Sequence, residues 1–230
     1  KGGSAPTSDR ACHLGPLIIR TYDDSPDVIA EFRGRRGRRR DIACMWHALS
    51  PIYQGAIRRH GFPFHAGLIE IDGRGVLLAG SSGRGKSTLC RRLSSSYPVL
   101  CDEETLIVRD TRGRYWTHPF PTWSRLLSQG YGERWDVQKA VPLSHILFII
   151  PAESDETTTL GQGRATMLIT RAALEKSLRS WCWGVEQGEG RAMKNRIFEN
   201  ACLLAGSIPA SLFSVSLTGR IERQLEKVIG

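Results

Sequence analysis

The chain has 230 residues, of which 40% are hydrophobic and 24% are charged, the balance of a globular protein that buries a substantial core. No apolar run approaches the roughly 20 residues that a membrane-spanning helix needs, which excludes a helical membrane span. The net charge is +9, and the segment Arg33–Arg40 contains six arginines and no acidic residue. Most of the net positive charge therefore lies in this one basic segment, and positive and negative charges nearly balance in the rest of the chain.

The sequence gives expectations for the domain boundaries and, through the cysteines, for the cellular compartment. We expect residues 1–10 to be disordered or left over from cloning, and residues 11–230 to form a single domain. No two of the six cysteines have the two-residue spacing of a zinc or redox motif. Reduced thiols, and hence a cytoplasmic protein, are the expectation.

The N-terminal third of the chain predicts a short strand, a basic loop and two helices. Leu17–Ile19 has the composition of a strand, and Arg33–Arg40 is expected to be a mobile loop. Apolar residues then recur at helical spacing between Met45 and Ile57, and Ser50-Pro51 divides them into two helices. The arginines suit a solvated loop or a docking site for an acidic peptide or protein. Nucleic acid is the least favoured partner, because no aromatic residue interleaves the run.

A hairpin is predicted directly before a glycine-rich segment. Residues 68–71 and 76–79 are strand-like, and the Asp72–Gly75 segment between them has the chemistry of a tight turn. The second strand is fully apolar and runs straight into GSSGRGKST, which extends from Gly80 to Thr88.

The remaining elements mix helices and strands. We expect helices at 86–96, 171–181, 193–205 and 221–228, strands at 97–101, 105–108, 115–117, 145–150 and 213–217, and loops at 118–123 and 153–159. Together with the hairpin, this order predicts an α/β or α+β protein built on one mixed sheet with flanking helices.

The segment from Gly80 to Ser87 satisfies the pattern G-x-x-x-x-G-K-[ST]. Its glycines let backbone N–H groups approach a phosphate, Lys86 supplies a cation for the β and γ oxygens, and Ser87 offers a hydroxyl to Mg²⁺. The helix that follows adds the partial positive charge of its N-terminus. The predicted nucleotide-binding residues are Gly80, Ser81, Ser82, Gly83, Arg84, Gly85, Lys86, Ser87 and Thr88.

Three acidic residues, Asp102, Glu103 and Glu104, follow the next strand. If that strand lies beside the strand that leads into the glycine-rich loop, the acids lie next to the phosphate. One carboxylate could then hold Mg²⁺ together with Ser87, and another could accept the proton of an acceptor hydroxyl.

The segments HAGLIEIDGRGVLLAGSSGRGKST and CDEE resemble the HPr kinase/phosphorylase group, whose P-loop fold is related to phosphoenolpyruvate carboxykinase. The chain resembles most the small HPr-kinase-like proteins of peptide-maturation cassettes, of the SynChlorMet type. The segments THPFPTWS and NACLLAGSIPASLFSVSLTGR carry that closer resemblance. It implies a central mixed sheet with an antiparallel hairpin before the P-loop, and a single nucleotide-binding domain at residues 11–230.

The resemblance also implies roles for individual residues. Asp102 would be the catalytic base, His65 its partner and Lys86 the phosphate-binding lysine. Ser87, Asp102 and Glu103 would hold the metal, although the family has Asp where this chain has Glu103. ATP and Mg²⁺ are the implied cofactors, and homo-oligomers are implied as well.

The expected function is a Mg-ATP-dependent kinase that phosphorylates a Ser or Thr hydroxyl of a peptide or protein, such as a precursor peptide in a maturation pathway. Two alternatives stay open. One is a P-loop kinase of small molecules, which would place residues 76–79 in an all-parallel sheet. The other is a non-catalytic, nucleotide-gated module whose arginines hold an acidic partner.

Overall fold

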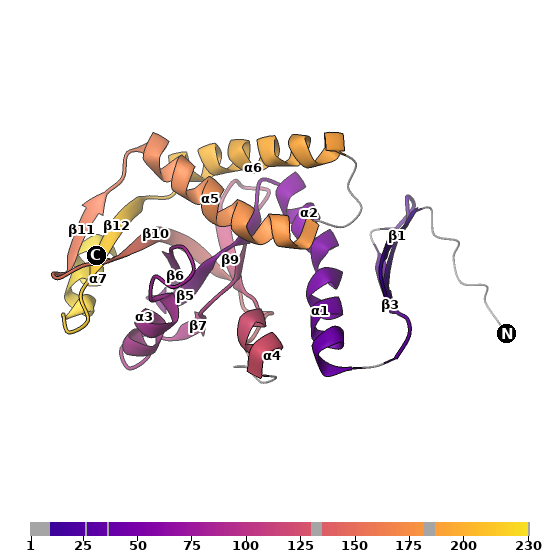
Figure 1. The fold of residues 1–230 in the computed structure, drawn as a ribbon. Helices are drawn as coiled ribbons and strands as arrows, with labels where there is room; N and C mark the ends of the chain where they lie inside the picture. The colour runs from indigo at the N-terminus through magenta and orange to yellow at the C-terminus, as the bar shows by residue number, and fades with distance from the viewer. Residues whose placement is uncertain (1–9, 26, 36, 130–134, 182–186, 230) are drawn as a thin grey trace.

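The computed structural model describes residues 10–229 except residues 26, 36, 130–134 and 182–186. Nine strands of the described chain form one mixed sheet (Figure 1). Its strands are β4 (Phe62–Phe64), β5 (Ala66–Ile71), β6 (Arg74–Ala79), β7 (Val99–Cys101), β8 (Thr105–Arg109), β9 (Tyr115–Pro119), β10 (Val141–Pro151), β11 (Glu156–Thr159) and β12 (Ala210–Val215).

The order along this sheet is β4-β8-β9-β10-β6-β5-β7, with β12 also paired to β10 and β11 paired to β12. β10 runs parallel to both β6 and β12, whereas β5 runs antiparallel to β6 and to β7. The predicted mixed α/β architecture with a central sheet is therefore confirmed.

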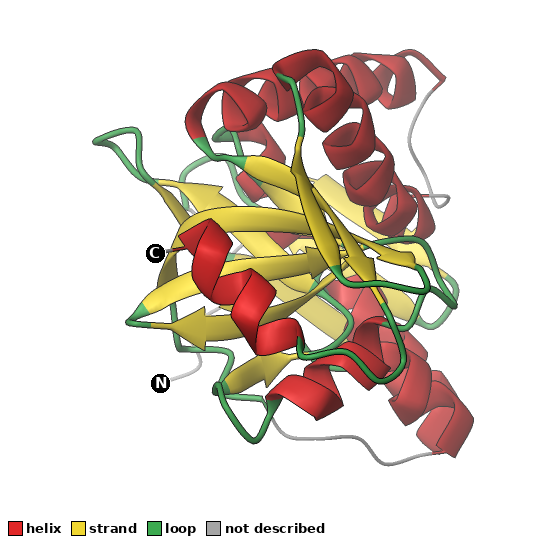
Figure 2. Cartoon of the chain, turned by 90° about the vertical axis from the view of Figure 1, so that its left-hand side faces the viewer, coloured by secondary structure: helices red, strands yellow, loops and turns green. Residues whose placement is uncertain are grey.

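The helices cover both faces of the sheet (Figures 1 and 2). The described helices are α1 (Arg38–Ala48), α2 (Ser50–Arg58), α3 (Lys86–Leu93), α4 (Trp123–Gln129), α5 (Gln162–Trp181), α6 (Gln187–Ser207) and α7 (Ile221–Ile229). α5 and α6 pack on one face with α2, and α3 and α7 pack on the other.

β6 contributes to both hydrophobic clusters because its side chains alternate between the two faces. Leu77 and Ala79 belong to the cluster under α5 and α6, whereas Val76 and Leu78 belong to the cluster under α3 and α7. All four side chains are fully buried. Full burial of a Val or Leu side chain stabilises a fold by roughly 1.5–3 kcal/mol, so β6 is firmly anchored where it enters the glycine-rich loop.

A separate three-stranded sheet precedes α1 and contains β1 (Arg10–Leu14), β2 (Leu17–Thr21) and β3 (Val28–Phe32). Leu17 and Ile19 of β2 pack against Cys44 of α1. Only the central strand was expected; the flanking strands β1 and β3 become part of a sheet by pairing with it on either side.

Two segments differ from the expected loops. Arg38–Arg40, the last three arginines of the predicted basic loop, form the first turn of α1. Residues 156–159, expected in a polar loop, form β11 because they pair with β12 at the edge of the sheet. The residue at position 36, within the predicted basic loop, lies outside the described residues.

Candidate functional site

The glycine-rich loop joins the end of β6 at Ala79 to the start of α3 at Lys86. Gly83 and Gly85 have φ angles of 80° and 84°, in the left-handed region that non-glycine residues rarely adopt. Open space surrounds the position where a Cβ would lie on each of them. The backbone therefore curls back before α3 and leaves room for an anion at the N-terminus of the helix.

Lys86 is the first residue of α3, and its side chain is 6% exposed. Its Nζ donates hydrogen bonds to the backbone oxygens of Gly80, at 2.7 Å, and of Ser81, at 3.2 Å. Burial lowers the pKa of Lys86 to about 8. Neutral carbonyls compensate a buried ammonium group poorly, so an anion at this position would be a stronger partner.

The acidic segment follows β7, on the same edge of the sheet as the loop. The acids were expected next to the loop if β7 lay directly beside β6, but β5 lies between these two strands and is antiparallel to both. β6 and β7 consequently point in the same direction, and their carboxyl ends reach the same edge. The acids therefore lie next to the loop although β6 and β7 are not paired with each other.

Both carboxylate oxygens of Asp102 have partners. Oδ1 accepts a hydrogen bond of 2.6 Å from the Thr122 hydroxyl, and Oδ2 lies 3.0 Å from Nη2 of Arg125. Thr122 in turn accepts a hydrogen bond from the indole N–H of Trp135, at 3.0 Å. Asp102 is 4% exposed, so these contacts fix its orientation within the site.

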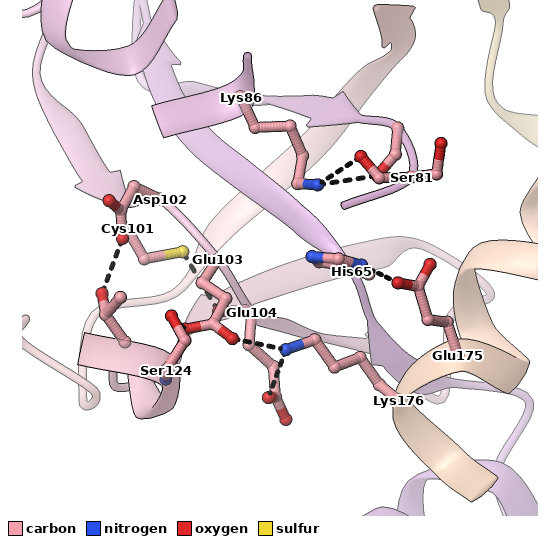
Figure 3. A network of polar contacts seen from close by, with 12 residues as sticks. His65, Ser81, Lys86, Cys101, Asp102, Glu103, Glu104, Ser124, Glu175 and Lys176 are labelled. Carbon is pink, nitrogen blue, oxygen red and sulfur yellow. Dashed lines mark hydrogen bonds and ion pairs between the residues drawn. The ribbon is translucent and has the colours of Figure 1, made fainter. Parts of the chain in front are cut away.

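Lys176 of α5 holds the other two acids. Its Nζ lies 3.1 Å from Oε1 of Glu103 and 3.1 Å from Oε2 of Glu104 (Figure 3). Burial opposes ionisation of Glu103, but Lys176 and two hydrogen bonds from Ser124 outweigh it and lower the pKa of that carboxyl. At Glu104, burial raises the pKa, although the phenol of Tyr53 donates a hydrogen bond to it.

His65 connects β4 to β5, and its Nδ1 lies 2.9 Å from Oε1 of Glu175 on α5 (Figure 3). Burial lowers the pKa of His65 to about 4, and the neighbouring charges of Lys176 and Lys86 act in the same direction. The imidazole is therefore neutral at neutral pH. The carboxylate of Glu175 favours the tautomer with the proton on Nδ1, which leaves the lone pair on Nε2.

These groups surround one polar cavity of about 370 Å³, called here the phosphate cavity. Its lining residues are His65, Ser82, Gly83, Gly85, Lys86, Ser87, Thr88, Asp102, Glu103, Thr122, Ser124, Arg125, Glu175 and Lys176. Most of the predicted site residues thus meet in one place. Gly80, Ser81 and Arg84 instead line an adjacent groove, and no residue of Arg33–Arg40 that the structure describes lines either cavity.

The cavity suits a phosphate chain with a divalent cation. Lys86, Arg125 and Lys176 supply positive charge, and the Ser87 hydroxyl lies in the same lining as the carboxylates of Asp102 and Glu103. No group of three or more His, Cys, Asp and Glu side chains that could hold a metal occurs among the described residues. A cation bound by Ser87 and one of these carboxylates would leave coordination positions open for phosphate oxygens, as Mg²⁺ does in kinase sites.

Five lining residues were not predicted: Thr122, Ser124, Arg125, Glu175 and Lys176. Thr122, Ser124 and Arg125 follow β9. Glu175 and Lys176 lie on α5, more than seventy residues beyond the residues that they contact, which are His65, Glu103 and Glu104. Their neighbours in the sequence carry no nucleotide-binding pattern. Trp123, the neighbour of Thr122, is buried and stacks on Trp46 at a centroid distance of 6.3 Å.

No helix within the described part of the chain is long and apolar enough to cross a membrane. The family model of the SynChlorMet cassette protein ScmC matches residues 28–230. No curated protein matches the chain. Among solved structures, the Hpr(Ser) kinase/phosphatase from Coxiella burnetii is similar with a TM-score of 0.37 and 11% identity, over 73% of this chain and 87% of that chain.

Proposed function

Because this chain belongs to the SynChlorMet cassette protein ScmC family, as its sequence led us to expect, we propose that it is a Mg-ATP-dependent kinase acting on a peptide hydroxyl. One observation carries the proposal. Asp102 lines the same cavity as the loop residues Lys86 and Ser87. A phosphate-binding loop and a fixed carboxylate at one cavity are the two parts that phosphoryl transfer to an alcohol requires.

The loop and three cations bind the triphosphate of ATP, which is the donor substrate. Backbone N–H groups at Gly83 and Gly85 and the N-terminus of α3 face the phosphates. Nζ of Lys86, which lies beside the carbonyls of Gly80 and Ser81, binds the β and γ oxygens. Ser87, with Asp102 or Glu103, would hold Mg²⁺, which would neutralise charge on the β and γ phosphates when bound.

Asp102 accepts the proton of the acceptor hydroxyl. As the hydroxyl oxygen forms its bond to the γ-phosphorus, the bond between that phosphorus and the β–γ bridging oxygen breaks, and ADP leaves with the electron pair. The hydroxyl proton moves to the carboxylate of Asp102. Thr122 and Arg125 keep this carboxylate oriented, and neutral His65 offers a hydrogen-bonding nitrogen to the acceptor.

The arrangement of the sheet supports a P-loop fold of the HPr kinase and phosphoenolpyruvate carboxykinase type, with residues 11–230 as one nucleotide-binding domain. β6 has antiparallel β5 on one side and parallel β10 on the other. An all-parallel sheet around β6 was the feature expected of a metabolite kinase. The mixed pairing therefore favours a peptide or protein acceptor over a small molecule.

Intact-mass analysis of candidate precursor peptides, co-expressed with this protein or incubated with it and Mg-ATP, tests the proposal. We expect a gain of one phosphate on one Ser or Thr residue, which tandem mass spectrometry would locate. Binding of ATP without any phosphorylated product in the presence of a peptide that binds would instead indicate a nucleotide-gated binding module.

A further inference from the structure

A second cavity of about 250 Å³ adjoins the glycine-rich loop and is called here the arginine groove. It combines three arginines with an apolar floor formed by residues of β10 and β12. Its lining residues are Gly80, Ser81, Arg84, Phe148, Ile149, Ile150, Arg164, Leu168, Arg171, Ala172, Glu175 and Leu212. The proposed transfer reaction gives no role to most of these residues.

One face of α5 forms a wall of the groove. Arg164, Leu168, Arg171 and Glu175 follow one another at spacings of four, three and four residues, which places them on the same side of the helix. Glu175, at the end of this row, also lines the phosphate cavity and contacts His65. The arginine groove and the phosphate cavity therefore meet at Glu175.

The groove is positively charged. Within the described part of the chain, Arg84, Arg164 and Arg171 have no carboxylate at ion-pair distance, and Arg164 and Arg171 are exposed. Glu175, the acid in the lining, is engaged by His65. Three guanidinium groups beside an apolar floor suit an occupant that carries both carboxylates and apolar side chains.

The position of Lys86 indicates which substrate enters from this side. Its Nζ lies against the carbonyls of Gly80 and Ser81, and the lysine of such a loop binds the β and γ phosphates. The γ end of ATP therefore lies toward the arginine groove. Thr88, at the other end of the loop, lines the phosphate cavity but not the arginine groove. The acceptor, which attacks the γ-phosphorus, approaches from the side of the groove.

We propose that the arginine groove binds an acidic, apolar-containing segment of the acceptor peptide next to the hydroxyl that is phosphorylated. The inference rests on the proposed kinase function. It assigns the recognition of acidic residues to α5 and Arg84, not to the basic segment Arg33–Arg40.

Peptide binding can be measured in the absence of phosphate transfer. The role of the arginine groove and the kinase function can therefore be tested independently. The probes are two short fluorescein-labelled peptides with a central serine, one with flanking Glu and Leu residues and one with Lys replacing Glu. Fluorescence anisotropy gives their affinities for the wild-type protein, the double variant Arg164→Glu/Arg171→Glu and the control Arg196→Glu. Arg196 is exposed on α6 and outside both cavities, and thermal unfolding checks that each variant is folded.

We expect the wild type and Arg196→Glu to prefer the acidic peptide, with binding that weakens as salt is raised. The double variant should lose at least about tenfold in affinity for it, equal to about 1.4 kcal/mol, and should now prefer the lysine peptide. Its affinity for a fluorescent ATP analogue should not change.

Equal affinity of the wild type for both peptides, or no binding of either, would overturn the groove assignment. The assignment would also be overturned if the double variant lost affinity for the ATP analogue and kept its affinity for the acidic peptide, because the groove would then hold the nucleoside. Acidic-peptide binding that depends on the two arginines without any phosphorylation would leave the groove assignment standing and count against the kinase proposal.

Discussion

Asp102 Oδ2 lies 3.0 Å from Arg125 Nη2, and this ion pair joins the acidic segment after β7 to the helix α4. Asp102 is 5% exposed at its side chain, whereas Arg125 is 29% exposed. The arginine can therefore move toward a phosphate without unfolding the site, while the carboxylate stays in place. This difference in exposure suits a catalytic base, Asp102, that is held in place beside a cation, Arg125, that can move.

Thr122 is predicted to position the base. Replacing Thr122 by Val removes the hydrogen bond to Asp102 Oδ1 and should lower kcat about tenfold, since a hydrogen bond to a charged group contributes about 1.5–3 kcal/mol. Thr122→Ser keeps the hydroxyl and should restore most of the rate. Steady-state kinetics with ATP and the peptide would check this, and equal rates for the Val and Ser variants would contradict it.

Lys86 is predicted to destabilise the protein when no anion is bound. Its pKa is about 8 in the folded chain, below the ordinary lysine value of 10.5 that applies to the unfolded chain. Between these two pH values the unfolded state therefore binds more protons than the folded state. The free energy of unfolding should rise as the pH increases from 8 toward 10.5, by up to about 3 kcal/mol.

Urea unfolding at pH 7.5 and pH 10 should show this gain for the wild type and not for Lys86→Met, with the exposed Lys194→Met as the control. Lys86→Met should also bind ATP more weakly by at least about tenfold, because the phosphates lose a direct cation. An unchanged ATP affinity would contradict the assignment of the loop.

Lys176 is predicted to be a structural cation as well as part of the cavity. Lys176→Met leaves Glu103 and Glu104 without their shared partner and should destabilise the protein by about 3–5 kcal/mol. Adding Glu104→Gln to that variant should recover part of the loss, because the buried charge is removed. Chemical unfolding would measure both, and a destabilisation that Glu104→Gln does not relieve would contradict the account.

The sequence predicted the parts of the site that are local, and it missed those that depend on folding. Gly80–Thr88 could be predicted because phosphate binding requires glycines, a lysine and a hydroxyl at this spacing. Asp102 could be predicted because it follows the next strand along the chain. Arg125, Glu175 and Lys176 are ordinary charged residues of helices, and only the packing of α4 and α5 against the sheet brings them to the cavity. The same holds for β11, whose polar residues become a strand only through pairing with β12.

The most direct test compares phosphate transfer by the wild type and Asp102→Asn, using γ-labelled ATP and the acceptor peptide, with the exposed Asp136→Asn as the control. The account predicts that Asp102→Asn binds ATP with wild-type affinity but transfers phosphate at least about a hundredfold more slowly, as expected when a general base is removed, and that Asp136→Asn is fully active. Wild-type transfer by Asp102→Asn would contradict the central claim that this carboxylate accepts the proton of the acceptor.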